Sequence, residues 1–311
     1  MIGSLVNDLG GQVMDALLVT FITVVERNNF TKASEELHLT QSAVSREIQV
    51  LEKKYGVKLF DRTNKYVRLT KAGEILYHHA KDILIQYDRV EKLIHDLAHS
   101  AQGVLEIGSG YTFGEYLLPR VIQEFKLLYP SIIPKITIKN SHRIASQVLR
   151  RELDIGIVEG KLEMQGLVAI PFARDEMVVI VSPAHRLAGR AVVEIGELGS
   201  ETWILRERGS GTREVTNRVF SDVGLSPTSI MEFGSSQVIK ESVEAGLGIS
   251  ILSEWTIRKE VKYGILSALK VRDVPISRDV CYVLPVTQFR TRATDLFVEC
   301  IPDLVKNLVL R

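Results

Sequence analysis

Cysteine is scarce in this chain of 311 residues, which contains only Cys281 and Cys300. So small a number excludes a disulfide framework and a cysteine-rich zinc site. Both residues lie in apolar stretches near the C-terminal end, without a CxxC motif or a nearby pair of histidines, so we predict that both are buried packing residues. The alternative, a thiol redox sensor, requires an exposed thiol close to positive charge.

Long hydrophobic runs are also absent, since no stretch approaches the roughly 18 apolar residues of a membrane span. The longest early run, 16–25, is interrupted by Thr20 and Thr23. Before its hydrophobic part stand Asp8 and Asp15 but no Lys or Arg, which is unlike a signal peptide. We therefore predict a cytoplasmic protein that does not bind membranes. Residues 1–13 predict a loose extension, with the folded part beginning at Met14.

Motifs of known catalytic sites are missing as well. The sequence contains no G-x-S-x-G, HExxH, GxGxxG or P-loop pattern. The seven histidines are scattered, and His95 and His99, four residues apart, have no evident further ligand. We therefore expect no enzyme, no metal site and no cofactor.

Neither sign of charge dominates, with 39 Lys and Arg against 38 Asp and Glu. The distribution is nevertheless uneven, because residues 41–71 carry eight basic side chains and only three acidic ones, Glu47, Glu52 and Asp61. A local basic patch in a neutral chain is typical of a nucleic-acid contact.

Residues 15–60 predict three short helices, with Thr31 as the N-cap of the second. Thr40 is the predicted N-cap of the third, which should run from Gln41 to Tyr55 and end at Gly56. In the third helix, Val44, Ile48, Leu51 and Tyr55 have the spacing of a buried stripe. Another face is polar and contains no acid, with Ser42, Ser45, Arg46, Gln49 and Lys53. That composition suits base edges and phosphates in a major groove, whereas the alternative is an ordinary solvated face.

The next segment, 57–70, alternates like two short strands joined at Asn64-Lys65, which predicts a hairpin. Its cations are Arg62, Lys65 and Arg68. Contact with phosphates or a minor groove is the functional interpretation, and a solvated hairpin tip is the alternative.

A long helix is predicted from Thr70 to about Ala101, because this stretch lacks proline and follows a heptad pattern. Its apolar positions are Leu76, Ile83, Val90 and Leu97, alternating with Ala80, Tyr87, Ile94 and Ala101. Such a seam favours a dimer through paired helices, although packing against the helix's own domain is the alternative.

From residue 103 onward, strand-like and helix-like segments alternate, which predicts an α/β fold with mostly parallel sheets. About 200 residues of this kind divide naturally into two lobes with a crevice between them.

Residues 14–73, with the stretch FTKASEELHLTQSAVSREIQVLEKKYGVKLFDRT, resemble the winged helix-turn-helix of LysR-type transcriptional regulators. Later segments, including DIGIVEG and AGLGISIL, are similar to the family's two-lobed domain, which is like the type 2 periplasmic binding proteins. The resemblance implies a winged helix-turn-helix over 14–71, a linker and dimerisation helix over 72–101, and an effector-binding domain over 103–311. RERGSGTR and SGYTFGEYLLP most resemble the CysL, YeiE and CbbR-like subgroup, whose members respond to sulfur or carbon-assimilation metabolites.

The same resemblance implies roles for particular residues and partners. The expected partners are double-stranded promoter DNA, a small effector, further copies of the chain in a dimer and tetramer, and RNA polymerase. The residues expected to contact DNA are Thr31, Lys32, Thr40, Gln41, Ser42, Ser45, Arg46, Gln49, Arg62, Lys65 and Arg68.

For the effector, two helix starts are rich in small and hydroxyl residues: Tyr111-Thr112 and Ser210-Gly211-Thr212, the latter flanked by Arg206. Helix N-termini and glycine-rich turns attract anions, so we predict an anion held between them, with an inorganic sulfur oxyanion as the leading candidate. Glu159 should point into the same space, paired with an arginine or accepting a donor from the ligand. The alternatives are ordinary capping by Ser and Thr and a solvated loop position for Glu159.

Two other functions compete with a regulator. A solute-binding protein of a transporter would share the second domain, but it would leave residues 14–101 unexplained. An α/β enzyme would need a catalytic motif that the sequence does not contain.

Overall fold

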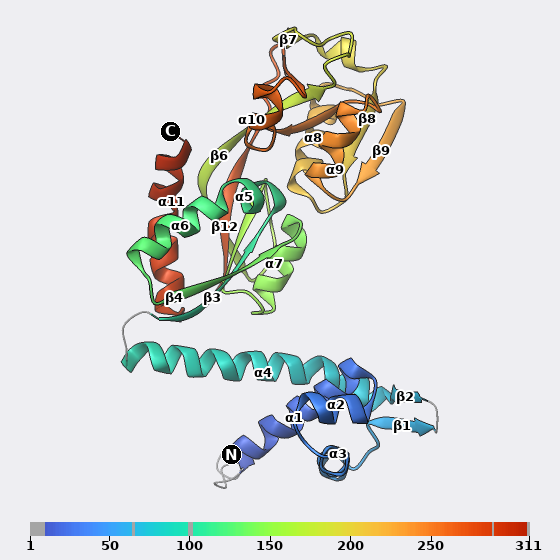
Figure 1. Ribbon diagram of the computed structural model, residues 1–311, viewed down its shortest axis with the longest axis vertical. Helices are drawn as coiled ribbons and strands as arrows, with labels where there is room; N and C mark the ends of the chain where they lie inside the picture. The colour runs from blue at the N-terminus through green and yellow to red at the C-terminus, as the bar shows by residue number, and fades with distance from the viewer. Residues whose placement is uncertain (1–9, 64–65, 99–101, 288, 310–311) are drawn as a thin grey trace. The chain divides into compact units, whose positions relative to one another are not determined.

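The computed structural model describes residues 10–63, 66–98, 102–287 and 289–309. The chain divides into two compact units between Ile94 and His95, and Figure 1 shows the elements of each. Among the described residues, no helix is long and apolar enough to cross a membrane.

The first unit is made of helices and one hairpin. Its elements are α1 (Gly10–Arg27), α2 (Phe30–Glu36), α3 (Gln41–Tyr55), β1 (Phe60–Thr63), β2 (Tyr66–Leu69) and α4 (Lys71–Ala98). The predicted helices, hairpin and long helix are thereby confirmed. The prediction that the fold begins at Met14 is wrong, because α1 already starts at Gly10. Glycine lowers helix propensity by about 1 kcal/mol but does not prevent a helix.

Aromatic and aliphatic side chains from α1, α2, α3 and β1 form the core of this unit. The ring of Phe60 lies 5.4 Å from that of Phe21 and 5.5 Å from that of Phe30. These contacts fix the positions of the hairpin and of α2 relative to α1.

The start of α2 differs from the prediction. Asn29, not Thr31, is the N-cap, and its side-chain oxygen accepts hydrogen bonds from the backbone N–H groups of Thr31 and Lys32 at 2.8 and 3.0 Å. The helix begins at Phe30, one residue before Thr31, and Asn29 stands directly before it as a residue type that favours the N-cap position.

The third helix has the predicted cap and most of the predicted buried stripe. Val44, Ile48 and Leu51 are fully buried, but Tyr55 is exposed because it lies in the last turn, beyond the core. Glu52 is buried instead, and its carboxylate accepts hydrogen bonds from Lys58 Nζ at 2.8 Å and from the Leu59 backbone N–H at 3.0 Å. These bonds hold the approach to β1 against the end of α3.

The second unit contains two lobes joined by two long strands, β6 (Leu167–Val181) and β12 (Ser277–Pro285) (Figure 1). The main sheet has the order β4-β3-β5-β12-β6-β11-β7, with β10 paired to β6, while β8 and β9 form a separate pair. The other strands of the second unit are β3 (Gly103–Ser109), β4 (Ile132–Ile138), β5 (Ile155–Glu159), β7 (Val192–Val193), β8 (Thr202–Arg206), β9 (Ser229–Phe233), β10 (Ser250–Ser253) and β11 (Ser267–Val271). Its helices are α5 (Tyr111–Tyr116), α6 (Leu118–Leu128), α7 (Ser141–Leu149), the 3-10 helix η1 (Ile195–Leu198), α8 (Gly211–Asp222), α9 (Ser236–Glu244), α10 (Glu254–Lys262) and α11 (Arg292–Val309).

The prediction of mostly parallel sheets is wrong for the strands that join the lobes. β3 pairs in parallel with β4 and β5, and β8 with β9, but β12 runs antiparallel to both β5 and β6. The reason is topological: β6 carries the chain from the first lobe to the second, and β12 brings it back beside β6. Hydrophobic alternation in the sequence does not reveal such a return.

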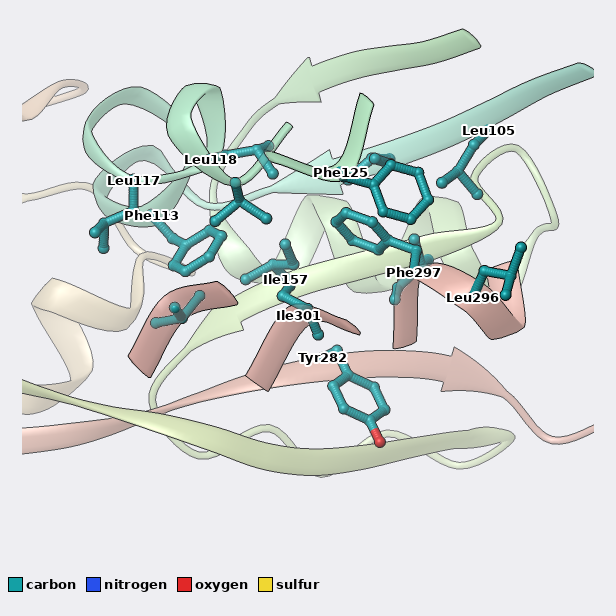
Figure 2. Close-up of a cluster of buried hydrophobic side chains, with 14 of the residues drawn as sticks. Leu105, Phe113, Leu117, Leu118, Phe125, Ile157, Tyr282, Leu296, Phe297 and Ile301 are labelled. Carbon is teal, nitrogen blue, oxygen red and sulfur yellow. The ribbon is translucent and has the colours of Figure 1, made fainter. Parts of the chain in front are cut away.

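Each lobe has its own apolar core. In the first, Phe125 of α6 packs edge-on against Phe297 of α11, with ring centres 5.1 Å apart, over the sheet residues Leu105 and Ile157 (Figure 2). In the second, Trp203 packs against Phe220 with ring centres 4.8 Å apart. Each lobe therefore packs around a core of its own, and the crossing strands connect the two lobes.

The two cysteines contribute to packing. Cys281 is buried in β12, as predicted, whereas Cys300 is only half-buried, with its Sγ 3.9 Å from the hydroxyl oxygen of Tyr129. Burial raises the pKa of the Cys281 thiol, which is the opposite of what a reactive redox sensor requires.

Replacing Asn29 tests the cap of α2. We expect Asn29→Ala to destabilise this helix by about 1 kcal/mol, because two backbone N–H groups lose their acceptor. Amide hydrogen exchange of residues 30–37 in the intact chain should then accelerate about fivefold. The control Thr31→Ala removes a hydroxyl that is not the cap, and an equal acceleration in that variant would contradict the assignment.

Candidate functional site

The polar face of α3 is available for contact. Gln41, Ser42, Arg46 and Gln49 are exposed, and Ser45 is half-buried. At the start of the helix, the hydroxyl of Thr40 accepts a hydrogen bond from the Ala43 backbone N–H at 3.2 Å and lies 3.0 Å from the Ser42 hydroxyl. The predicted recognition residues therefore share one face, which begins at a capped helix N-terminus.

Two of the three acidic residues in this basic segment are turned away from that face. The carboxylate of Glu47 accepts a hydrogen bond from the Thr20 hydroxyl of α1 at 2.5 Å. Glu52 is buried and bound by Lys58. Since both acids have partners inside the unit, the exposed side of α3 presents hydroxyl, amide and guanidinium groups.

Other predicted DNA contacts flank this face. Thr31 and Lys32 are exposed at the start of α2, and Arg68 is exposed on β2. Arg68 lies opposite Asp61 in the register of the hairpin. The Arg62 side chain and the whole of Lys65 lie outside the described residues.

The long helix α4 uses its heptad pattern in two ways. Near its start, Ala80 is fully buried and Leu76 packs on the core of the first unit. Further along, Ile83, Tyr87, Val90 and Ile94 are exposed by 43 to 62%. A groove of 770 Å³ runs along this part, lined by His79, Asp82, Ile83, Gln86, Tyr87 and Val90. The Leu97 side chain and Ala101, the last seam positions, lie outside the described residues.

In the second unit, two of the predicted effector residues, Thr112 and Thr212, meet at an arginine that the sequence did not single out. Arg278, on β12, donates hydrogen bonds to the hydroxyl of Thr112 at 2.9 Å and to that of Thr212 at 3.0 Å. Its Nε also donates to Oδ2 of Asp175 at 2.8 Å. The two helix starts predicted to face one another are therefore joined through one guanidinium.

A second arginine occupies the Tyr111 side of this junction. The Arg206 guanidinium lies 4.7 Å from the centre of the Tyr111 ring and donates to the Ser236 hydroxyl at 3.1 Å. It is also paired with Glu207 at 2.8 Å. Ser210 is buried and is the N-cap residue of α8, but its side chain makes no capping bond, so the alternative of ordinary side-chain capping does not apply to it.

Glu159 lies beside both predicted helix starts, but its carboxylate is bound within the protein. It is only 5% exposed, and its carboxylate accepts hydrogen bonds from the Phe113 backbone N–H at 2.9 Å and from the Ser141 hydroxyl at 3.2 Å. The expectation of an arginine partner is wrong among the described contacts, and so is the alternative of a solvated loop residue. Glu159 holds α5 and α7 together because its carboxylate meets the N-terminal ends of both.

Gly211 has a structural reason to be glycine. A Cβ atom at this position would lie 1.8 Å from the backbone oxygen of Glu159. The adjoining loop is fixed to the first lobe by the Asn140 amide, which donates to Glu207 at 3.2 Å, and by the His142 N–H, which donates to the Gly209 oxygen at 3.2 Å. The RERGSG segment therefore joins the lobes in this structure.

Arg278 and Asp175 were missed because nothing local marks them. They face one another across β12 and β6, which are about 100 residues apart in the chain, so only the strand pairing reveals the contact. An arginine close to the start of an alternating strand usually lies at a solvated strand end, so Arg278 gave no local sign of burial.

Both parts of the chain match known protein families. Residues 16–74 match the bacterial regulatory helix-turn-helix protein, lysR family, and residues 98–306 match the LysR substrate binding domain. The transcriptional regulator CysL of Bacillus subtilis is 35% identical over 295 residues, covering 95% of this chain and 99% of its own. YeiE of Escherichia coli K12, described as an uncharacterized transcriptional regulator, is 36% identical and covers 82% of this chain and 85% of its own.

Solved structures agree with this assignment. The regulatory domain of CcmR from Synechocystis, in complex with 2-PG, is 30% identical and covers 66% of this chain and 99% of its own, with a TM-score of 0.61. Full-length CbnR in complex with its target DNA shares the fold, with a TM-score of 0.74 at 20% identity, covering 93% of this chain and 99% of its own. The chain thus belongs to the LysR family and is a LysR-type transcriptional regulator, with an N-terminal helix-turn-helix followed by an effector-binding domain.

Proposed function

We propose that this regulator reads promoter DNA with the exposed face of α3, and that an anion bound between the lobes of the second unit controls transcription. The observation that carries the DNA assignment is the segregation of charge on α3: Glu47 and Glu52 have internal partners, while Ser42, Arg46 and Gln49 do not share their face with an acid. Arg and Gln are the side chains that pair with guanine and adenine edges. Thr31, Lys32 and the hairpin cations would bind phosphates beside the groove.

Arg46→Ala tests this interface. If Arg46 makes a bidentate contact with a base, its loss should cost about 1–3 kcal/mol of specific binding. A mobility-shift titration with the chain's own promoter measures the change. Lys54→Ala is the control, because Lys54 has the same charge on the same helix but lies outside the polar face. Equal losses in the two variants would contradict base recognition by Arg46.

We further propose that α4 pairs with its counterpart in a second copy, in a dimer that assembles further into a tetramer. The apolar side chains from Ile83 to Ile94 are exposed within one chain, and a helix with such a stripe is stabilised by a partner. From the family we also propose that the regulator acts in the cytoplasm, with RNA polymerase as a further partner.

Ile83→Glu tests the pairing. A carboxylate at this seam position would be buried without a partner, at a cost of several kcal/mol, so sedimentation velocity should show weakened dimers. Ile85→Glu is the matched control, since it is the same change two residues along, on the opposite side of the helix. A fully dimeric Ile83→Glu variant would show that another surface holds the dimer.

For the effector, we propose a small oxyanion that contacts Thr112, Ser210 and Thr212, with Tyr111 and Arg206 beside it. The support is that Thr112 and Thr212, one from each lobe, are buried and contact Arg278 through their hydroxyl groups, and that Ser210 is buried beside Thr212 in the chain. The similarity to CysL over nearly the whole chain favours sulfur assimilation or cysteine biosynthesis as the regulated pathway. A second candidate is a carbon-fixation pathway with an organic acid as effector, because regulators described as probable RuBisCO transcriptional regulators are 30% identical and the CcmR domain binds 2-PG.

The unfolding temperature of the full chain, measured with each candidate effector, distinguishes a sulfur compound from an organic acid as the ligand. Sulfite, sulfate, thiosulfate, O-acetylserine and 2-PG should be compared at equal ionic strength, because a ligand that binds only the folded chain stabilises it by about 2.7 kcal/mol at 100 times its Kd. We expect a sulfur compound to raise the unfolding temperature most. Stabilisation by 2-PG alone would favour the carbon-fixation alternative, and glycerol is the uncharged control.

A further inference from the structure

The starting observation is a buried ion pair between the two crossing strands. Arg278 is 4% exposed and Asp175 is fully buried, and the two are directly paired in the register of β12 and β6. Both Nε and one terminal nitrogen of the guanidinium lie 2.8 Å from Oδ2 of Asp175. The other oxygen, Oδ1, accepts a hydrogen bond from the Ser253 hydroxyl at 2.6 Å. The positive charge of Arg278 is therefore neutralised within the protein.

The remaining contacts of the guanidinium reach both lobes. One terminal nitrogen donates to Thr112, on α5 of the first lobe, and the other donates to Thr212, on α8 of the second. A guanidinium has donors only and cannot accept a hydrogen bond. Both threonine oxygens therefore act as acceptors, and both hydroxyl protons must point away from Arg278.

We propose that Arg278 is a positioning residue that fixes the hydroxyls of Thr112 and Thr212 as a pair of hydrogen-bond donors. The effector is then selected for two oxygens that carry no proton at these contacts, as in a fully ionised oxyanion. This inference rests on the effector site proposed above and adds the rule by which that site discriminates. A ligand that offers O–H or N–H groups to the same positions meets two protons and leaves buried donors unpaired, which costs affinity.

The position of Arg278 also relates the ligand to the movement of the lobes. It stands on a crossing strand, between residues of both lobes, and both hydroxyls are buried in this structure. An oxyanion therefore reaches them when the lobes part, and it then contacts one donor from each lobe. Binding of this kind favours the arrangement of lobes in which both donors reach the same ligand, because a ligand shifts a conformational equilibrium only through its differential affinity.

The test uses the full chain and calorimetric titration with sulfate, sulfite, thiosulfate and 2-PG, and it follows whichever anion binds most tightly. Thr112→Val and Thr212→Val should each weaken binding at least about tenfold, because each removes a hydrogen bond to a charged group. Thr112→Ser and Thr212→Ser keep the hydroxyl and should stay within about threefold of the natural chain.

Two further variants isolate the role of Arg278. Arg278→Lys keeps a head group that can only donate hydrogen bonds. We expect it to retain part of the anion affinity, and more of it than the double variant described next. Asp175→Asn combined with Arg278→Gln leaves the buried pair uncharged but introduces an amide oxygen that can accept the hydroxyl proton of a threonine. We expect the double variant to lose more than about tenfold in anion affinity.

Three results would overturn the proposal: no binding of any of the four anions to the natural chain, binding to both valine variants within about threefold of the natural value, or equal losses in the lysine variant and the double variant. If the double variant does not fold, the comparison of valine with serine decides. Promoter binding by the natural chain is measured separately, and its absence would contradict the DNA interface without affecting these results.

Discussion

The second unit depends on one buried ion pair, between Asp175 and Arg278 on the two strands that connect the lobes. Burial raises the pKa of the Asp175 carboxyl, and the charge of Arg278 opposes that rise. Removing one partner of such a pair generally costs about 3–5 kcal/mol, because the other charge remains buried and unpaired. The pair is therefore tolerated only because Ser253, Thr112 and Thr212 satisfy its remaining hydrogen bonds.

This compensation determines how the site can recognise an anion. Arg206 is paired with Glu207, Arg278 with Asp175, and the nearby buried Lys240 with Glu260. Glu159 has only N–H and O–H partners among the described contacts. At the centre of the junction, the hydroxyl groups of Thr112 and Thr212 are therefore oriented by an arginine whose own charge is neutralised. The polar face of α3 differs in this respect. The acids of that helix, Glu47 and Glu52, have partners inside the unit, whereas Arg46 remains exposed to solvent.

Much of the first unit could be predicted from the sequence because its pattern is local. The caps, the buried stripe of Val44, Ile48 and Leu51, and the hairpin follow from residues close together in the chain. The exceptions, Asn29 as the cap and the exposed Tyr55, concern helix ends, where a shift of one or two residues changes the role of a side chain. In the second unit the two helix starts were located correctly. Arg278, Asp175 and the internal role of Glu159 could not be predicted, because each depends on a contact between distant segments.

The most direct test of effector recognition by oriented hydroxyl groups is to compare how salt affects the protein's affinity for promoter DNA and its affinity for the effector. Affinity for promoter DNA should fall steeply and linearly on a log–log plot, since counterions are released from the phosphates. Affinity for the effector, measured by calorimetry between about 50 and 300 mM salt, should change by less than about twofold, because buried dipoles are little screened. A parallel, steep loss of effector affinity would show that the site attracts its ligand through uncompensated charge and would contradict the account.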